Sequence, residues 1–238
     1  MATLLLLIIY LAFISLGLPD SLLGAAWPVM RQDLGAPIGM AGVLSVTVTI
    51  GTIISALSTN RVVRRIGTAR TTLISVALTA AALFGFWAAP SVAWLVIAAI
   101  PLGLGAGAVD SALNHYVAAH YKAHHMNWLH CFWGVGVTVS PLIMSVFLTE
   151  SAWRDGYLTI GLIQSGIVAV LFASLPLWKR VDERRNGGGQ ARAANPSAGG
   201  AAGESGPGNR SGVKYALLTF LFYCGVEVTV GLWGSSYL

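Results

Sequence analysis

Long apolar runs separated by short polar segments dominate the chain. A helix needs roughly 20 mainly apolar residues to cross about 30 Å of hydrocarbon, and at such lengths only helices satisfy the backbone in lipid. Seven runs qualify, at approximately 4–29, 38–59, 71–89, 92–118, 127–148, 157–178 and 214–238. The pattern therefore predicts an all-α membrane protein with seven transmembrane helices.

The composition agrees with the bilayer as solvent. Of 238 residues, 55% are hydrophobic and only 10% are charged, which is too apolar for an ordinary soluble domain. The net charge of +5 does not indicate a nucleic-acid partner, because the basic residues fall in short segments between apolar runs. Cys131 and Cys224 lie inside apolar runs, so no disulfide is expected.

The basic residues gather in alternate loops and predict the orientation. The loops after even-numbered spans carry Arg61, Arg64, Arg65, Arg70, Lys122, Lys179, Arg180, Arg184, Arg185, Arg192, Arg210 and Lys214. The other loops hold only Arg31 and Arg154. Because positive loops stay inside, we expect a multi-pass protein of the cell (inner or plasma) membrane with a cytoplasmic N-terminus. An outer aromatic belt would consist of Trp27, Trp87, Trp94 and Trp153.

One polar segment divides the chain into domains. Residues 181–213 are rich in Gly, Ala, Ser, Asn, Pro and Arg and predict a disordered cytoplasmic linker. It separates a six-helix bundle, 1–180, from a seventh helix, 214–238. That last run ends without a polar flank, so we expect a second half, or a second copy, to be needed for function.

Three acids lie within apolar runs: Asp20, Asp110 and Glu227. An acid at a helix centre costs about 2.5–3.5 kcal/mol on insertion scales, so each should face a bundle interior or a wet cavity. Asn114 follows Asp110 by four residues and shares its helix face, where the pair could bind a hydroxylated solute. Structural hydrogen bonds between helices are the alternative for each acid.

Two short repeats surround these acids. The tetrapeptide at 20–23 (Asp-Ser-Leu-Leu) resembles the one at 110–113 (Asp-Ser-Ala-Leu), as an inverted repeat of three plus three helices would produce. The seventh run repeats the first: Asp20, Gly24 and Trp27 correspond to Glu227, Gly231 and Trp233.

Five histidines gather around the junction of the fourth and fifth runs: His115, His120, His124, His125 and His130. No cysteine or acid accompanies them at ligand spacing, so we expect no metal. His130, one turn after Asn127, could titrate near neutral pH. A proton relay and a hydrogen-bonded helix end are both open for it.

The segment 60–70 resembles the signature loop of the major facilitator superfamily, in which Arg65, Gly67 and Arg70 fit. The departures from that signature are Asn60, Arg64 and Thr68. The resemblance covers the whole chain as the N-terminal six-helix bundle, the central loop and the first helix of the second half. It implies secondary transport, with these three matching residues in a gating loop.

Within the superfamily, the fourth and fifth runs look like the fucose permease branch. The matching residues are Asp110, Asn114, Asn127, His130, Phe132 and Gly136, while Trp133 stands at a polar sugar-binding position. The resemblance implies that Asp20 gains and loses a proton during transport.

These features predict proton-coupled uptake of a sugar-like or other small polar metabolite. We assign proton coupling to Asp20, His130 and Glu227, and substrate binding to the following residues: Asp110, Asn114, Asn127 and Trp133. Drug and proton antiport is one alternative, which Gly136, Ser140 and Pro141 resemble in part, and a non-transporting scaffold or sensor is another. The sequence has no nucleotide loop or catalytic triad, so we expect neither an enzyme nor a cofactor.

Overall fold

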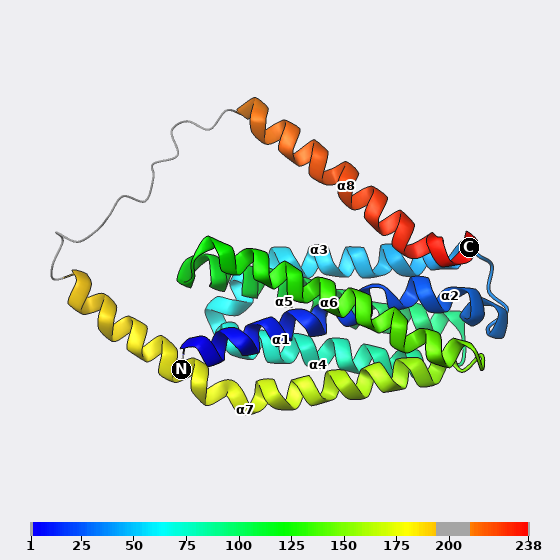
Figure 1. Ribbon diagram of the computed structural model, residues 1–238, viewed down its shortest axis with the longest axis horizontal. Helices are drawn as coiled ribbons and strands as arrows, with labels where there is room; N and C mark the ends of the chain where they lie inside the picture. Colours follow the sequence, from blue (N-terminus) through cyan, green and yellow to red (C-terminus); the bar gives the residue numbers. More distant parts are fainter. Residues whose placement is uncertain (1, 194–209, 238) are drawn as a thin grey trace.

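The computed structural model describes residues 2–193 and 210–237, and these residues form helices without strands. The helices are α1 (Ala2–Asp20), α2 (Leu22–Asp33), α3 (Met40–Ile66), α4 (Thr68–Trp87), α5 (Val92–His120), α6 (Ala123–Leu148), α7 (Trp153–Ala193) and α8 (Arg210–Tyr237). Helices α1 to α7 run roughly along one axis as a bundle, and α8 leans against one end of it (Figure 1).

The predicted all-α membrane fold is confirmed. Six helical segments are long and apolar enough to cross a bilayer: Thr3–Asp33, Met40–Ile66, Thr68–Trp87, Val92–His120, Ala123–Leu148 and Trp153–Val181. The seventh predicted run is also helical, although its described apolar part, Leu221–Gly234, is shorter. The chain is therefore a multi-pass membrane protein.

The first span is divided where the sequence predicted one continuous helix over 4–29. Helix α1 ends at Asp20, and α2 begins at Leu22. Pro19 has no backbone N–H, so the carbonyl of Ser15 cannot receive the usual helical bond from it. The regular pattern resumes when the Ala25 N–H donates to the Ser21 carbonyl at 3.2 Å. Asp20 consequently lies at a junction between two helices.

Helix α7 extends further than the sequence predicted. It continues to Ala193 and so includes the first part of the segment predicted as a disordered linker, 181–213. Glu, Arg, Gln and Ala in that part have high helix propensity. Residues 194–209 lie outside the described part of the chain, so the domain boundaries remain predictions.

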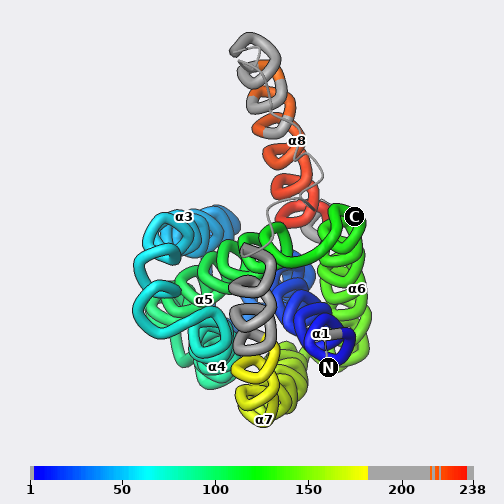
Figure 2. Tube along the Cα trace, turned by 90° about the vertical axis from the view of Figure 1, so that its left-hand side faces the viewer, coloured from blue at the N-terminus to red at the C-terminus, as the bar shows by residue number. Residues whose placement is uncertain are grey.

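The packing of the bundle has an internal symmetry. Helix α1 packs on α6 and α7, while α5 packs on α3 and α4. If α1, α3 and α4 exchange places with α5, α6 and α7, the contacts of α1 with α6 and α7 become the contacts of α5 with α3 and α4. The α4–α7 contact is then unchanged. Figure 2 shows α1 and α5 near the middle of the bundle, between these partners. This arrangement fits the inverted repeat of three plus three helices.

A glycine three residues before each repeated acid makes a close contact with a neighbouring helix. A Cβ atom at Gly17 would collide with the backbone carbonyl of Trp133 in α6. In the same way, a Cβ atom at Gly107 would collide with the carbonyl of Thr52 in α3. Small residues allow backbones to approach this closely in membranes. We call these contacts the two glycine seams.

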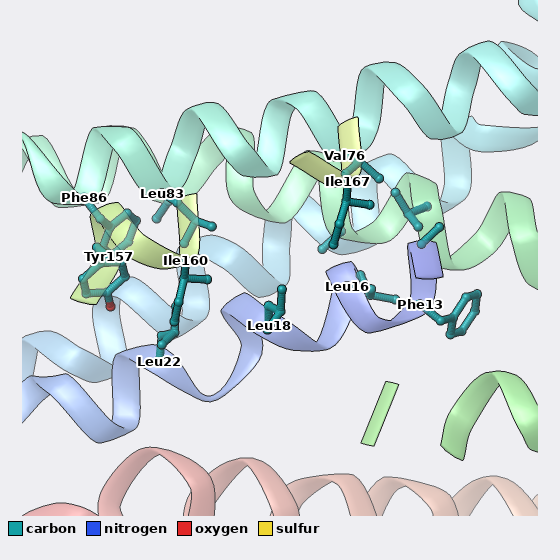
Figure 3. Packing of buried hydrophobic residues seen from close by; sticks show 14 of the residues in the cluster. Phe13, Leu16, Leu18, Leu22, Val76, Leu83, Phe86, Tyr157, Ile160 and Ile167 are labelled. Atoms are coloured by element: carbon teal, nitrogen blue, oxygen red, sulfur yellow. The ribbon is translucent and has the colours of Figure 1, made fainter. Parts of the chain in front are cut away.

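Apolar side chains fill the space between α1, α2, α4 and α7. Figure 3 shows Leu22 of α2 near Ile160 of α7, and Phe86 of α4 beside Tyr157 of α7. The rings of Phe86 and Tyr157 are stacked with their centroids 5.1 Å apart. All four side chains are buried, so this cluster fixes α7 against the rest of the bundle.

The predicted outer aromatic belt is only half correct. Trp87 and Trp94 are 40% and 44% exposed, as belt residues should be, but Trp27 and Trp153 are 0% and 1% exposed. The indole N–H of Trp27 donates to the Ile38 carbonyl at 3.1 Å. These two tryptophans are therefore internal packing residues, each with a polar partner for its N–H group.

We expect Gly107→Val to destabilise the bundle by about 1–3 kcal/mol, the usual cost of overpacking, because its side chain would push α3 from α5. The measurement is the thermal unfolding midpoint in mild detergent. Gly166→Val in α7 is the matched control, since its Cβ would meet no atom within 4 Å. Equal midpoints for the two variants would contradict the role of the seam.

Candidate functional site

Asp20 and Trp133 are joined by a hydrogen bond between two helices. The indole N–H of Trp133, on α6, donates to Oδ2 of Asp20, at the end of α1, over 2.8 Å. The first glycine seam brings the two side chains within hydrogen-bonding distance, because Gly17 packs directly on the backbone of Trp133. The sequence assigned these residues separate roles and did not predict their contact.

Asp110 and Asn114 form the predicted pair on one face of α5. The Asn114 amide nitrogen donates to Oδ1 of Asp110 over 2.8 Å. The other polar atom of the amide, Asn114 Oδ1, is buried and has no hydrogen-bond partner among the described residues. A buried acceptor without a donor is costly, so this oxygen is suited to accept a hydrogen bond from a bound solute.

The intramembrane acids converge on one region. The carboxylate of Asp20 is close enough to those of Asp110 and Glu227 for their charges to repel one another. Asp110 is in turn within electrostatic range of the His130 ring. Four helices, α1, α5, α6 and α8, thus contribute one ionisable group each to a shared site.

His130 is oriented by its own helix. Its Nδ1 donates to the Met126 carbonyl at 3.1 Å, which fixes the ring against α6. The ring also lies beside Phe13 of α1, with centroids 6.1 Å apart. Asn127 is exposed on α6, and no hydrogen bond joins it to the converging residues in the part of the chain that the structure describes.

The site faces away from the bundle core and toward α8. Asp20 and Asp110 are both exposed on the bundle surface. Helix α8 makes its main contact with α2, where a Cβ atom at Gly24 would collide with the Gly231 carbonyl. Starting from that contact, α8 diverges from the bundle toward the end at which the N-terminus lies (Figure 1). The two glycines are the ones that the repeated pattern places four residues after Asp20 and Glu227.

The residues of the predicted gating loop lie elsewhere. Gly67 has a φ of 82° and directly joins the end of α3 to the start of α4, a conformation that favours glycine. Arg65 and Arg70 are exposed on either side of this turn. The turn lies at the end of the bundle where α1 begins (Figure 1).

Sequence reasoning missed two polar contacts between helices at the ends of the bundle. Arg154 forms an ion pair with Asp33 at the end of α2, and the Tyr10 hydroxyl is hydrogen-bonded to His125 Nδ1 at 2.7 Å. The only signal for the first was opposite charge in two loops on the same side. Among the described residues no three His, Cys, Asp or Glu side chains converge as metal ligands.

A double-mutant cycle tests the contact between Asp20 and Trp133. We expect Asp20→Ala and Trp133→Phe to be coupled by about 1 kcal/mol of unfolding free energy, since each removes the same hydrogen bond. The measurement is unfolding in mild detergent. As a control, Trp94→Phe removes an indole that donates to the Gly85 carbonyl instead, so it should show no coupling to Asp20→Ala. Additive effects of the first pair would contradict the contact.

Comparisons with known proteins agree with this architecture. The chain is similar to a protein of Acinetobacter baylyi named Niacin transporter NiaP, with 27% identity over 156 residues. The match includes 63% of this chain and 33% of that protein, so the chain spans about one third of the curated relative it matches. Residues 9–237 match the family described as the Major Facilitator Superfamily. Since this match covers nearly the whole chain, the protein belongs to the Major Facilitator Superfamily.

Proposed function

We propose that this chain forms the N-terminal part of a secondary active transporter that couples uptake of a small polar metabolite to proton movement. The observation that carries the proposal is the convergence of Asp20, Asp110 and Glu227. Ionisable groups inside membrane spans are expensive and usually belong to substrate or proton pathways. Packing alone does not require three acids from three helices at one place.

Proton coupling follows from the repulsion between these carboxylates. The negative charges of Asp110 and Glu227 both repel the Asp20 carboxylate, and binding of a proton to Asp20 removes that repulsion. Trp133 fixes the orientation of the Asp20 carboxylate, and His130 is within electrostatic range of Asp110. We assign proton binding to Asp20, with His130 and Glu227 as further proton-binding groups.

Solute binding is assigned to the faces of α5 and α6. Asn114 Oδ1 offers a hydrogen-bond acceptor that has no partner among the described residues, and the hydrogen-bonded Asp110 carboxylate retains further acceptor positions. The Trp133 indole adds a flat apolar surface for a ring, and Asn127 is an additional polar group on α6. A small ring-shaped solute with hydrogen-bond donors suits this set. Sugars and nicotinate, the latter suggested by the name of the relative, are the compounds to test first.

Alternating access would use the contact between α2 and α8. In transporters of this type two repeats rock around a fixed midplane site. Gly24 and Gly231 lie one helical turn beyond Asp20 and Glu227, so the two helices meet just past the acids and diverge in the other direction. With the N-terminus in the cytoplasm, as the basic loops predict, this conformation would open toward the cytoplasm.

The resemblance to drug and proton antiporters has a packing explanation. Gly136 lies in the first glycine seam, where a Cβ atom would collide with the Ile14 carbonyl. Ser140 hydrogen-bonds with Ser21 at 3.0 Å. These contacts join α6 to the first span and give no particular support to efflux.

We expect Asp20→Asn in the full-length transporter to abolish solute accumulation driven by a pH gradient, while exchange of solute between the two sides continues. The amide cannot bind and release the coupled proton, but it keeps a similar shape. Uptake of labelled nicotinate and sugars into membrane vesicles measures both activities. Asp155→Asn, at an exposed acid in the first turn of α7, is the control. Normal accumulation by Asp20→Asn would reject proton coupling through this residue.

A second test concerns the contact between α2 and α8. We expect Gly24→Ala to reduce transport at least several-fold without preventing membrane insertion, because its methyl group would collide with the Gly231 backbone. Gly231→Ala is the matched control, since its own Cβ points into open space. Similar transport rates for the two variants would contradict a role for close approach at this crossing.

A further inference from the structure

A groove lies between α3 and α4 on the outside of the bundle. Helices α3 and α4 both pack closely on α5 but only slightly on each other, so α5 forms the floor of the space between them. The floor and both walls are lined by Ile54, Ser55, Ser58, Thr59, Val62, Ile66, Thr71, Ile74, Ser75, Leu78, Leu104 and Ala108. Most of the exposed lining is apolar, which suits a hydrocarbon chain.

The polar side chains in the groove are largely occupied by the protein itself. The Ser55 hydroxyl donates to the Leu104 carbonyl, and the hydroxyls of Thr59 and Thr71 donate to the carbonyls of Ser55 and Gly67 at 2.7 and 2.8 Å. These hydroxyls therefore present mainly carbon atoms to the groove. Small side chains such as Ser58 and Ala108 give the groove its depth.

Arginines surround one end of this groove. The turn at Gly67 brings together the last turn of α3, with Arg64 and Arg65, and the first turn of α4, with Arg70. Arg65 lies three residues after Val62 and seven after Ser58, on the face of α3 that lines the groove. Arg70 lies one turn before Ile74 on α4. Arg64 points to a different side of α3 by the same helical spacing.

Among the side chains that the structure describes, these arginines form no ion pair with an acid. The sequence has no Asp or Glu between Asp33 and Asp110. The ion pair that the structure shows among its described side chains joins Arg154 to Asp33, not these residues. The arginines of the turn are exposed at the end of two membrane-spanning helices, where polar headgroups are expected.

We propose that the groove binds one anionic phospholipid, with an acyl chain between α3 and α4 and its phosphate at Arg65 and Arg70. Arginine matches the geometry of phosphate with two parallel hydrogen bonds. Basic pockets between transmembrane helices are suited to anionic lipid headgroups. The groove supplies the apolar contact that a free phosphate ion would lack.

The first test compares lipid retained by the purified protein. The full chain is purified in mild detergent from cells that contain phosphatidylglycerol and phosphatidylethanolamine, and bound lipid is quantified by mass spectrometry. We expect the double variant Arg65→Gln/Arg70→Gln to retain several-fold less phosphatidylglycerol, and Arg64→Gln to retain as much as the parent. An equal loss of phosphatidylglycerol from the double variant and from Arg64→Gln would show that the lipid is attracted by surface charge in general, and it would overturn the site.

A second variant separates the groove from the charges. Ser58→Phe fills the groove and keeps every arginine, so it should lose the same lipid to a similar extent. Full retention by Ser58→Phe would overturn the proposal that an acyl chain occupies the groove.

A third measurement needs no variant. We expect phosphatidylglycerol to raise the unfolding midpoint of the unmodified protein, while glycerol phosphate, which carries the same charge without acyl chains, leaves it unchanged. An equal rise with glycerol phosphate would identify a site for soluble phosphate, and no rise with either compound would reject the lipid site.

Discussion

The candidate site depends on the close backbone approach at the two glycine seams. Side chains of ordinary size at Gly17 and Gly107 would push α1 from α6 and α5 from α3. In a bilayer the hydrophobic effect does not drive helices together, so van der Waals packing and hydrogen bonds between helices must do so. The seams supply this packing three residues before each acid. The positions of both carboxylates thus follow from backbone contacts.

The two halves of the repeat use the same packing for different chemistry. Trp133 stands three residues before Gly136, and its indole reaches Asp20 across the first seam. At the second seam, Thr52 takes the place of Trp133 against Gly107, and its hydroxyl donates to the backbone carbonyls of Val48 and Gly103. Asp110 is instead held by Asn114 of its own helix. A symmetric scaffold therefore holds two acids in unequal surroundings.

The sequence predicted the spans well because they follow from solvation, and the same argument singled out the acids as candidates. Apolar length predicted the helices, and the cost of charge in lipid singled out Asp20 and Asp110. The bond from Trp133 to Asp20 could not be predicted, since it depends on which faces of α1 and α6 meet. The same applies to the buried bond from Gln164 to Thr79, 2.8 Å between α7 and α4.

Boundaries were harder to predict than spans. The hydropathy of the first run gives no sign of the break at Ser21, although Pro19 supplies a local cause. The sequence also assigned Trp27 and Trp153 to a membrane interface from their position near span ends. Their burial reflects neighbours from other helices, which hydropathy does not include.

The break at Ser21 has a mechanical consequence. A continuous helix resists bending because each turn is held by several backbone hydrogen bonds, whereas the junction between α1 and α2 already lacks the bond that Pro19 cannot donate. The first span is therefore more compliant beside its carboxylate than an unbroken helix would be. Force applied to α2 through its contact with α8 would be concentrated at the residue next to Asp20.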